Sequence, residues 1–412
     1  MTSEGAVRLG FMASIPTRVK LLIFTQILNT FSFGYFLIYV TAYLVEINVV
    51  DAGQVGILLG LESGVVILAG IPLALQSDKT GRKKFLIFGN SILPFTIILF
   101  AITHDFATYL LAVCIAGVAE ASSLGSWNAI IADQTDLTNR DAAFSLSFIV
   151  SNVSLSAGLA LPLVMPFLQT TLGLGADFVH SGTLLLFGIL NFAAPFFIWY
   201  LLRDYKEAPR AETDREEPGQ LRLLLKFSGL NGIIGLGAGL IIPILGTWLL
   251  YKFSVTDTYS GPFLALSSMT IAFAAVGSPR LSKRYGLFRA ILMTAGSSTF
   301  FMFTIAFIPN VLLAGFMYLM RASLMNMASP LLDSYLMSIV HPSRRGLGSA
   351  LSAIVWRLPN SVTTILGGLI LSYGYTTGNH FYYDVPWLAA SILYVIGIVL
   401  IFVTFRNVKP KG

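Results

Sequence analysis

The chain has 412 residues, of which 55% are hydrophobic and only 11% are charged, and its formal net charge is +6. Because a soluble domain carries roughly 25% charged residues, this composition excludes an ordinary water-soluble protein. The Lys and Arg residues lie in short stretches between long apolar runs and form no continuous basic face, so the positive charge does not indicate a nucleic-acid partner.

Twelve apolar segments succeed one another along the chain. A bilayer core of about 30 Å needs roughly 20 apolar residues per helix, and lipid satisfies no open backbone group. The runs are continuous rather than alternating, which excludes a membrane β-barrel. We therefore predict an all-α membrane protein with twelve transmembrane helices, at about 19–45, 54–77, 84–103, 107–133, 143–168, 179–202, 222–250, 259–280, 287–308, 310–339, 346–373 and 385–405.

The basic residues orient these predicted spans. With the amino terminus inside, every Lys and Arg except Lys252, Arg321 and Arg357 lies on the cytoplasmic side or at its helix ends. Cytoplasmic loops of membrane proteins carry an excess of Lys and Arg. We expect both termini in the cytoplasm, and the short loops and tails favour a plasma membrane, the inner membrane of the cell.

The second half of the chain repeats features of the first at a constant offset. Gly81 and Gly286 each lie in a basic loop and are 205 residues apart. The same offset separates other identical pairs: Gly34 and Gly239, Arg140 and Arg345, and Ser147 and Ser352. Paired halves of this kind are typical of transporters. Residues 203–221 mix charges with Pro and Gly, so we predict a six-helix bundle over 1–202, a linker over 203–221 and a second bundle over 222–412.

The arrangement of six plus six helices, a central linker and a doubled loop resembles the major facilitator superfamily over essentially the whole chain. The family writes the loop after span two as Gly-x-x-x-Asp-Arg/Lys-x-Gly-Arg-Lys/Arg, and this chain matches it at Asp78, Lys79, Gly81, Arg82 and Lys83. Ala74 stands where the leading glycine is usual, and Lys283 occupies the Asp78 position of the second copy. The resemblance implies two pseudo-symmetric bundles and a secondary transporter that works by alternating access.

The doubled loop predicts a gate. Gly81 and Gly286 permit the tight turn between two antiparallel helices, and Asp78 caps a helix start. In the family this motif stabilises one gating state together with an acidic residue at the end of span four, a position that Asp133 holds here, with Arg140 in the following loop. We expect Asp78, Arg82 and Asp133 to form a conformational latch.

Ionisable residues at bilayer depth are candidates for function because they are costly there unless paired or hydrated. Spans one, four, seven and ten line the central cavity in this family, which favours Glu120 and Arg321 as substrate-binding or coupling residues. Glu120, Ser123 and Trp127 share one helix face. Two alternatives stay open: Glu120 ties two helices together, and Trp127 is a packing or lipid-facing side chain.

Polar residues on spans one and ten extend the candidate binding site. Asn29 and Ser32 belong to a polar and aromatic stripe on span one, although such stripes also serve packing. On span ten, Asn326 and Asp333 lie two turns apart on one face. Asp333 is also close enough to the helix end to be solvated.

Glu62 and Arg357 lie on spans two and eleven, which face one another across the domain seam in this family. We expect a bridge between them that opens and closes with the transport cycle, the alternative being that each charge is satisfied within its own half. Pro359 leaves the carbonyl of Val355 without a helical donor, which loosens the helix around the arginine.

Two kinds of transport fit these residues. Buried carboxyls such as Glu62 and Glu120 suit proton coupling, and one embedded acid with aromatic neighbours is the pattern of drug/proton antiporters in this superfamily. The antiporter glycine-proline signature of span five has only a loose echo in residues 157–162. Arg321 and Arg357 instead suit an anionic solute. We favour proton-coupled export of small amphipathic compounds over uptake or facilitated transport of an organic anion or other small polar solute.

Other classes of protein fit the sequence less well. An enzyme needs a nucleophile and base or a set of metal ligands, whereas the four histidines form no ligand motif and the single Cys114 forms no disulfide framework. The sequence has no phosphate-binding loop for ATP. A receptor or channel subunit stays open as an alternative. We expect no enzyme activity, cofactor or metal, and a monomer whose partners are a small-molecule substrate, protons as the coupling ion and the bilayer.

Overall fold

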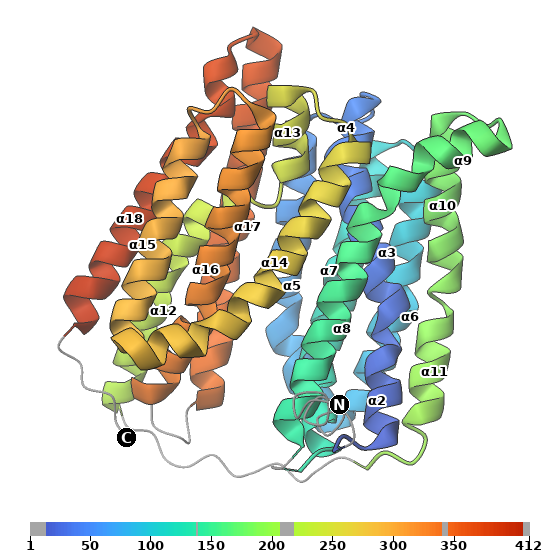
Figure 1. Ribbon diagram of the computed structural model, residues 1–412. Coiled ribbons are helices and arrows are strands. Elements are labelled where there is room, and N and C mark those ends of the chain that lie inside the picture. Colours follow the sequence, from blue (N-terminus) through green and yellow to red (C-terminus); the bar gives the residue numbers. More distant parts are fainter. Residues whose placement is uncertain (1–13, 137–138, 207–217, 340–344, 407–412) are drawn as a thin grey trace, which may run out of the picture. The chain divides into compact units, whose positions relative to one another are not determined.

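The computed structural model describes residues 14–136, 139–206, 218–339 and 345–406, and the described residues form helices and turns without a strand (Figure 1). The chain divides into two compact units, the first comprising Met1–Tyr39 and Val65–Arg210 and the second comprising Val40–Gly64 and Ala211–Gly412. This division groups residues by contact, and it assigns the residues between Tyr39 and Val65 to the second unit. The predicted division at the linker 203–221 follows the sequence repeat instead and stays a prediction.

The helices follow the predicted apolar segments closely. In the first unit these are α2 (Thr17–Phe24), α3 (Gln26–Ile38), α6 (Arg82–Ile102), α7 (Phe106–Asp133), α8 (Arg140–Ala160), α9 (Met165–Leu172), α10 (Ala176–Leu190) and α11 (Ala193–Leu201). The short 3-10 turn η2 (Leu161–Val164) joins α8 to α9, and α5 (Ala52–Thr80) runs through the boundary between the units.

A short π-helical turn, η1 (Tyr39–Tyr43), crosses from the first unit into the second, which continues with α4 (Leu44–Glu46) and the first part of α5. Its remaining helices are α12 (Pro218–Gly239), α13 (Leu245–Phe253), α14 (Asp257–Tyr285), α15 (Leu287–Ile305), α16 (Val311–Ile339), α17 (Arg345–Thr377) and α18 (Val385–Phe405), with the 3-10 turn η4 (His380–Tyr383) before α18.

Ten helical stretches among the described residues are long and apolar enough to cross a membrane. The two other predicted spans, 222–250 and 259–280, coincide with α12–α13 and with α14. Large apolar side chains lie exposed on the helix surfaces, among them Phe178 and Phe196 at 67% and 61%. Such exposure suits a lipid-facing surface, and the predicted all-α membrane fold with twelve helices is confirmed.

Close helix crossings repeat at the offset seen in the sequence. In the first unit α3 crosses α8 so tightly that a Cβ at Gly34 would clash with the carbonyl oxygen of Leu155. In the second unit α12 crosses α17, and a Cβ at Gly239 would clash with the carbonyl oxygen of Asn360. Both members of the second contact lie 205 residues after those of the first. The sequence repeat is therefore a repeat of backbone packing.

The doubled loops also share a backbone. The N–H of Gly81 donates to the carbonyl of Ser77, and the N–H of Gly286 donates to that of Ser282, each at 2.9 Å. Both glycines have positive φ, 118° and 84°, and each separates two long helices. Positive φ is a conformation that glycine adopts without steric cost, which explains why the sequence places glycine at both turns.

Candidate functional site

An ion pair joins the start of α6, directly after the loop that follows α5, to the end of α7. A guanidinium nitrogen of Arg82 lies 2.9 Å from a carboxylate oxygen of Asp133, and the two side chains are only 19% and 11% exposed. The hydroxyl of Tyr205 donates to the same carboxylate, and the Nζ of Lys83 donates to the carbonyl of Leu202 at 2.7 Å. These contacts tie the start of α6 and the end of α7 to the segment after α11.

The other members of the predicted gate have local roles or are not described. Arg140 donates to the carbonyls of Ala132 and Thr135, at 3.1 and 3.2 Å, and so caps the carboxyl end of α7. Lys79 is exposed. The side chain of Asp78 lies outside the described residues, so the third member of the latch stays a prediction.

A chain of polar side chains crosses three helices of the first unit. The amide nitrogen of Asn29 on α3 donates to the amide oxygen of Asn90 on α6 at 3.1 Å. Asn90 in turn donates to the hydroxyl of Ser123 on α7 at 3.4 Å. Glu120 is half-buried on α7, one turn before Ser123. Asn90 thus joins the predicted residues Asn29 and Ser123. Sequence reasoning missed Asn90, although an Asn in an apolar span is itself a signal.

Trp127 belongs to a second polar group, one turn further along α7. Its indole N–H donates to the hydroxyl of Ser147 on α8 at 3.2 Å. The side-chain amide of Gln26 on α3 also donates to Ser147, to its carbonyl at 2.9 Å. The ring of Trp127 packs against apolar clusters that include Ile23, Ile130 and Ile131. Its indole therefore joins α7 to α8, and the role of Trp127 in substrate binding stays a prediction.

Ser32 faces the interior of the first unit. Its side chain is fully buried, and its hydroxyl accepts a hydrogen bond from Asn191 at 2.7 Å while donating to the carbonyl of Leu28. Asn191 lies between α10 and α11. This bond joins span one to span six, a contact that spacing along span one gives no means of predicting.

Arg321 is a buried cation in the second unit. It lies on α16, is 4% exposed, and donates from its guanidinium to the hydroxyl of Tyr394 on α18 at 2.8 Å. The guanidinium carbon also lies 5.6 Å from the centre of the Tyr394 ring. Its Nε is buried without a hydrogen-bond partner among the described residues, and no described carboxylate forms an ion pair with it. A buried guanidinium held by a neutral hydroxyl retains donors for an anion.

The other candidates on α16 lie further along the same helix. Asn326 is half-buried and donates to the carbonyl of Ala322 at 2.8 Å, one turn before it. The side chain of Asp333 lies outside the described residues. Glu120 and Arg321 belong to different units, so their pairing stays a prediction.

Glu62 and Arg357 lie within one unit, on helices that pack closely. Glu62 is 8% exposed on α5, and Arg357 is half-buried on α17. A Cβ at Gly56 of α5 would lie 2.7 Å from the carbonyl of Thr364, and a Cβ at Gly60 would lie 2.7 Å from that of Ser361. The two helices are antiparallel, since the contacts move to lower residue numbers on α17 as they move to higher ones on α5. Extended by a few residues, the same register brings the backbone of Glu62 opposite that of Arg357 to within about one helical turn.

A carboxyl of the second unit that lies outside the predicted spans, Asp384, has a pKa that is changed by burial. Asp384 precedes α18 and forms an ion pair with Lys252, which follows the predicted span 222–250. Burial raises the pKa of Asp384, an effect that the hydrogen bond and charge of Lys252 oppose. Lys252 also donates to the carbonyl of Ala306 at 2.9 Å. The pair anchors α13 to the start of α18.

Comparison with known proteins agrees with this architecture. A sequence profile described as Major Facilitator Superfamily matches residues 22–364. A tetracycline resistance protein, class H, of Pasteurella multocida is 23% identical over 88% of this chain and 89% of its own length. The crystal structure of a bacterial homologue of the human lysosomal transporter Spinster, in an inward-facing and occupied conformation, superposes with a TM-score of 0.76 and 16% identity over 94% of this chain and 96% of that one.

A second solved structure has the same fold. That of the nucleoside transporter NupG has a TM-score of 0.71 and 14% identity, over 96% of this chain and the whole of its own. At these identities the solved structures support the fold, and the profile match covers most of the chain. The doubled glycine turns and doubled helix crossings agree with this match. The protein is an integral membrane transporter, and the chain belongs to the major facilitator superfamily.

Proposed function

We propose that this transporter exports small amphipathic compounds in exchange for protons, by alternating access. The observation that carries the proposal is Glu120, a half-buried carboxyl on α7 that lies one turn before Ser123, the last member of the polar chain of Asn29, Asn90 and Ser123. Ionisable residues at bilayer depth are costly and mark proton relays and substrate pathways, which makes Glu120 the candidate coupling residue. The similarity to a tetracycline resistance protein supports export of a drug-like compound.

Two contacts would couple the proton to the cycle. The ion pair of Arg82 and Asp133 would hold one gating state, with Asp78 as its third member. The register of α5 and α17 supports a bridge between Glu62 and Arg357 that forms and breaks during turnover. A Glu62→Arg and Arg357→Glu double variant tests the bridge: we expect it to recover transport that each single variant loses, and no recovery would refute the bridge.

The location and topology belong to the same proposal. We place both termini in the cytoplasm and the protein, as a monomer, in the plasma membrane. A green fluorescent protein fused after Gly412 should fluoresce, because that protein folds in the cytoplasm. A dark fusion that is nevertheless inserted at normal amounts would contradict this orientation.

Purified protein in liposomes with a trapped pH dye tests export directly. We expect tetracycline or ethidium, added to one side, to evoke proton movement that protein-free liposomes do not show. Proton movement is the measured quantity because it reports coupling for any transported compound, whether or not that compound is the physiological substrate. Solute flux with no proton movement would contradict the proposal.

Transport of an organic anion is a second candidate, favoured by Arg321. Its buried guanidinium is held by the neutral hydroxyl of Tyr394, with a buried Nε that lacks a partner among the described residues. A carboxylate on the solute would complete its hydrogen bonding. In the same liposomes, benzoate or a dicarboxylate that moves while tetracycline and ethidium do not would establish this alternative.

A further inference from the structure

A cavity of about 440 Å³ lies within the first unit, away from the polar chain around Asn90. It is formed by the carboxyl end of α6, the turn before α7 and the amino-terminal part of α10. Its lining residues are Ala101, Ile102, Thr103, His104, Asp177, Phe178, Ser181, Gly182 and Leu185. This volume falls in the range of small-molecule sites, and the mixture of apolar walls with a few polar groups is typical of them.

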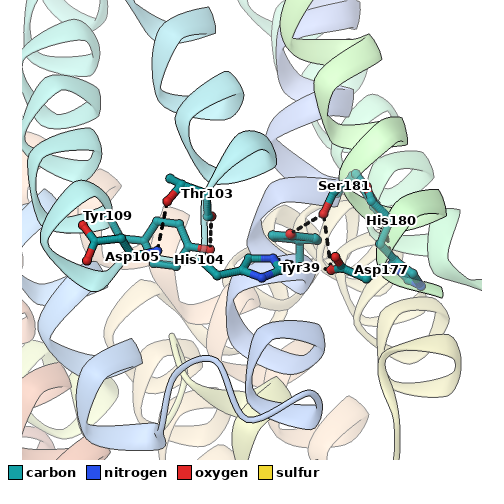
Figure 2. A network of polar contacts seen from close by, with 9 residues as sticks. Tyr39, Thr103, His104, Asp105, Tyr109, Asp177, His180 and Ser181 are labelled. Atoms are coloured by element: carbon teal, nitrogen blue, oxygen red, sulfur yellow. Dashed lines mark hydrogen bonds and ion pairs between the residues drawn. The ribbon is translucent and has the colours of Figure 1, made fainter. Parts of the chain in front are cut away.

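The polar end of the cavity centres on one carboxylate. The Oδ1 of Asp177 lies 3.4 Å from Nε2 of His104 and 3.5 Å from the hydroxyl of Ser181 (Figure 2). Ser181 is itself hydrogen-bonded to the hydroxyl of Tyr39 at 3.1 Å. Both contacts of Asp177 fall on the same oxygen, and the described residues give none to Oδ2. The carboxylate is thus positioned from one side and retains an oxygen for a ligand.

The charges around this end favour a cation. None of the nine lining residues is Lys or Arg. Asp105, in the turn between α6 and α7, adds a second carboxylate, and hydrogen bonds from the hydroxyl and N–H of Thr108 lower its pKa. A metal ion is not indicated, because the described residues contain no group of three or more ligands that could hold one. A primary ammonium group is the cation that one carboxylate and neighbouring hydroxyls bind well.

The remaining wall is apolar and runs along α10 into the depth of the span. Phe178, Gly182 and Leu185 are spaced by four and three residues and so share one helix face. Leu185 lies about 12 Å further along the helix axis than Asp177, at 1.5 Å per residue. A Cβ at Gly182 would meet nothing within 4 Å, which shows that this face is open there.

The cavity lies at the ends of two apolar helices. The candidate span of α6 ends at Ile102 and that of α10 begins at Ala176, so Thr103 and His104 follow one span directly and Asp177 lies in the first turn of the other. These are the positions at which such helices would leave the hydrocarbon of a bilayer. Ile102 and Phe178 are 62% and 67% exposed. A polar end at the interface with an apolar wall leading into the span matches an amphiphile that has a small ammonium headgroup and a long chain.

We propose that this cavity binds an aminophospholipid, phosphatidylethanolamine, with its ammonium group on Asp177 and an acyl chain along the face of Phe178, Gly182 and Leu185. The hydroxyl of Thr103 is a donor available to the lipid phosphate. This site is separate from the proposed export activity and does not depend on it.

Native mass spectrometry of the purified full-length chain tests the site. The probes are palmitoyl-oleoyl phosphatidylethanolamine and the phosphatidylcholine with the same two acyl chains. We expect wild type to retain the ethanolamine lipid preferentially. Asp177→Asn should weaken this lipid about tenfold, the effect of losing one hydrogen bond between charged groups. Gly182→Leu should fill the open face and reduce the binding of both lipids.

Matched variants control for folding and charge. Asp204→Asn removes a carboxylate of nearly equal exposure, 55% against 56%, and Gly296→Leu adds the same bulk at another helical glycine whose Cβ would meet nothing within 4 Å. Both should retain the wild-type preference, and a thermal melt identifies any variant that fails to fold. Three results would overturn the site: equal retention of the two lipids by wild type, an unchanged preference in Asp177→Asn together with unchanged binding in Gly182→Leu, or retention of dodecylamine without retention of the ethanolamine lipid.

Discussion

The two halves of the chain share a backbone but differ in chemistry. Gly34 approaches the carbonyl of Leu155 in the first half as Gly239 approaches that of Asn360 in the second. The turns at Gly81 and Gly286 have the same hydrogen bond, of the same length. The two halves therefore share their backbone conformation at these helix crossings and at the turns between helices.

Arg82, Asp133 and Glu120, by contrast, have no charged counterpart 205 residues later. Arg82 pairs with Asp133 in the first half, whereas the residue 205 positions after Arg82 is Leu287, and its neighbour Phe288 stacks on Phe402 at 6.1 Å between ring centres. Glu120 corresponds to Met325 by the same offset. The difference suggests that duplicated backbone carries the fold, while residues present in one half carry the steps of transport.

The largest effect should follow a change at the shared crossings. Gly34→Ala and Gly239→Ala each place a methyl group against a backbone carbonyl, which cannot move aside as a side chain would. We expect each to lower stability by about 3 kcal/mol or more, the upper range for overpacking. Thermal melting in detergent measures this, with Gly296→Ala as the control because its Cβ has open space. A milder loss in one half would show that the crossings are not equivalent.

Arg321→Met, in the second half, should reduce transport without lowering stability. Replacing a buried charge by an apolar side chain of similar length is often neutral or stabilising, so the melting temperature should stay the same or rise. If Arg321 binds a solute, transport should fall more than tenfold, since a hydrogen bond to a charged group is worth about 1.5–3 kcal/mol and a guanidinium offers several. Tyr394→Phe removes one bond to the arginine and should cost less. Full transport by Arg321→Met would make the arginine dispensable.

Asp133→Asn tests the pair that only the first half has. The variant leaves Arg82 largely buried without its carboxylate and weakens the acceptor of Tyr205, so we expect a loss of about 2–3 kcal/mol, below the range for fully buried pairs. The exposed pair of Arg18 and Asp204 is the control, and Asp204→Asn should change stability by less than about 1 kcal/mol. Equal effects would refute the distinction between the two pairs.

Gly286→Ala and Gly81→Ala should have the smallest and most similar effects. Both glycines adopt backbone angles that cost other residues about 1–3 kcal/mol. At Gly286 a Cβ would meet nothing within 4 Å, so the expected loss there is conformational alone. Melting temperatures that differ widely between the two variants would indicate a further contact at one of the turns.

The sequence predicts the helices much better than the direction in which each side chain points. Twelve apolar runs and two glycine turns were sufficient to predict the fold. An apolar run of this length in lipid forms a helix, and a turn with positive φ favours glycine. The motif also led to Asp133, which lies beside Arg82. Helices that are apolar on all sides give no hydrophobic face to read, however.

Ser32 and Asn90 are two residues whose contacts the sequence does not reveal for this reason. Ser32 has the spacing of a cavity-lining residue, yet its hydroxyl is buried against Asn191. Asn90 belongs to no motif, yet it joins Asn29 to Ser123. These contacts depend on how six helices rotate as they pack, and that rotation is decided by contacts between segments far apart in the chain.

The central claim, that Glu120 couples protons to transport, is tested most directly by substrate-evoked proton flux in liposomes containing wild type, Glu120→Gln or Glu62→Gln. We predict that Glu120→Gln abolishes the proton flux although the protein folds and inserts normally. Glu62→Gln should slow proton and solute movement together and keep their ratio, as expected of a gate. A Glu120→Gln variant that moves protons and solute in the wild-type ratio would contradict the account.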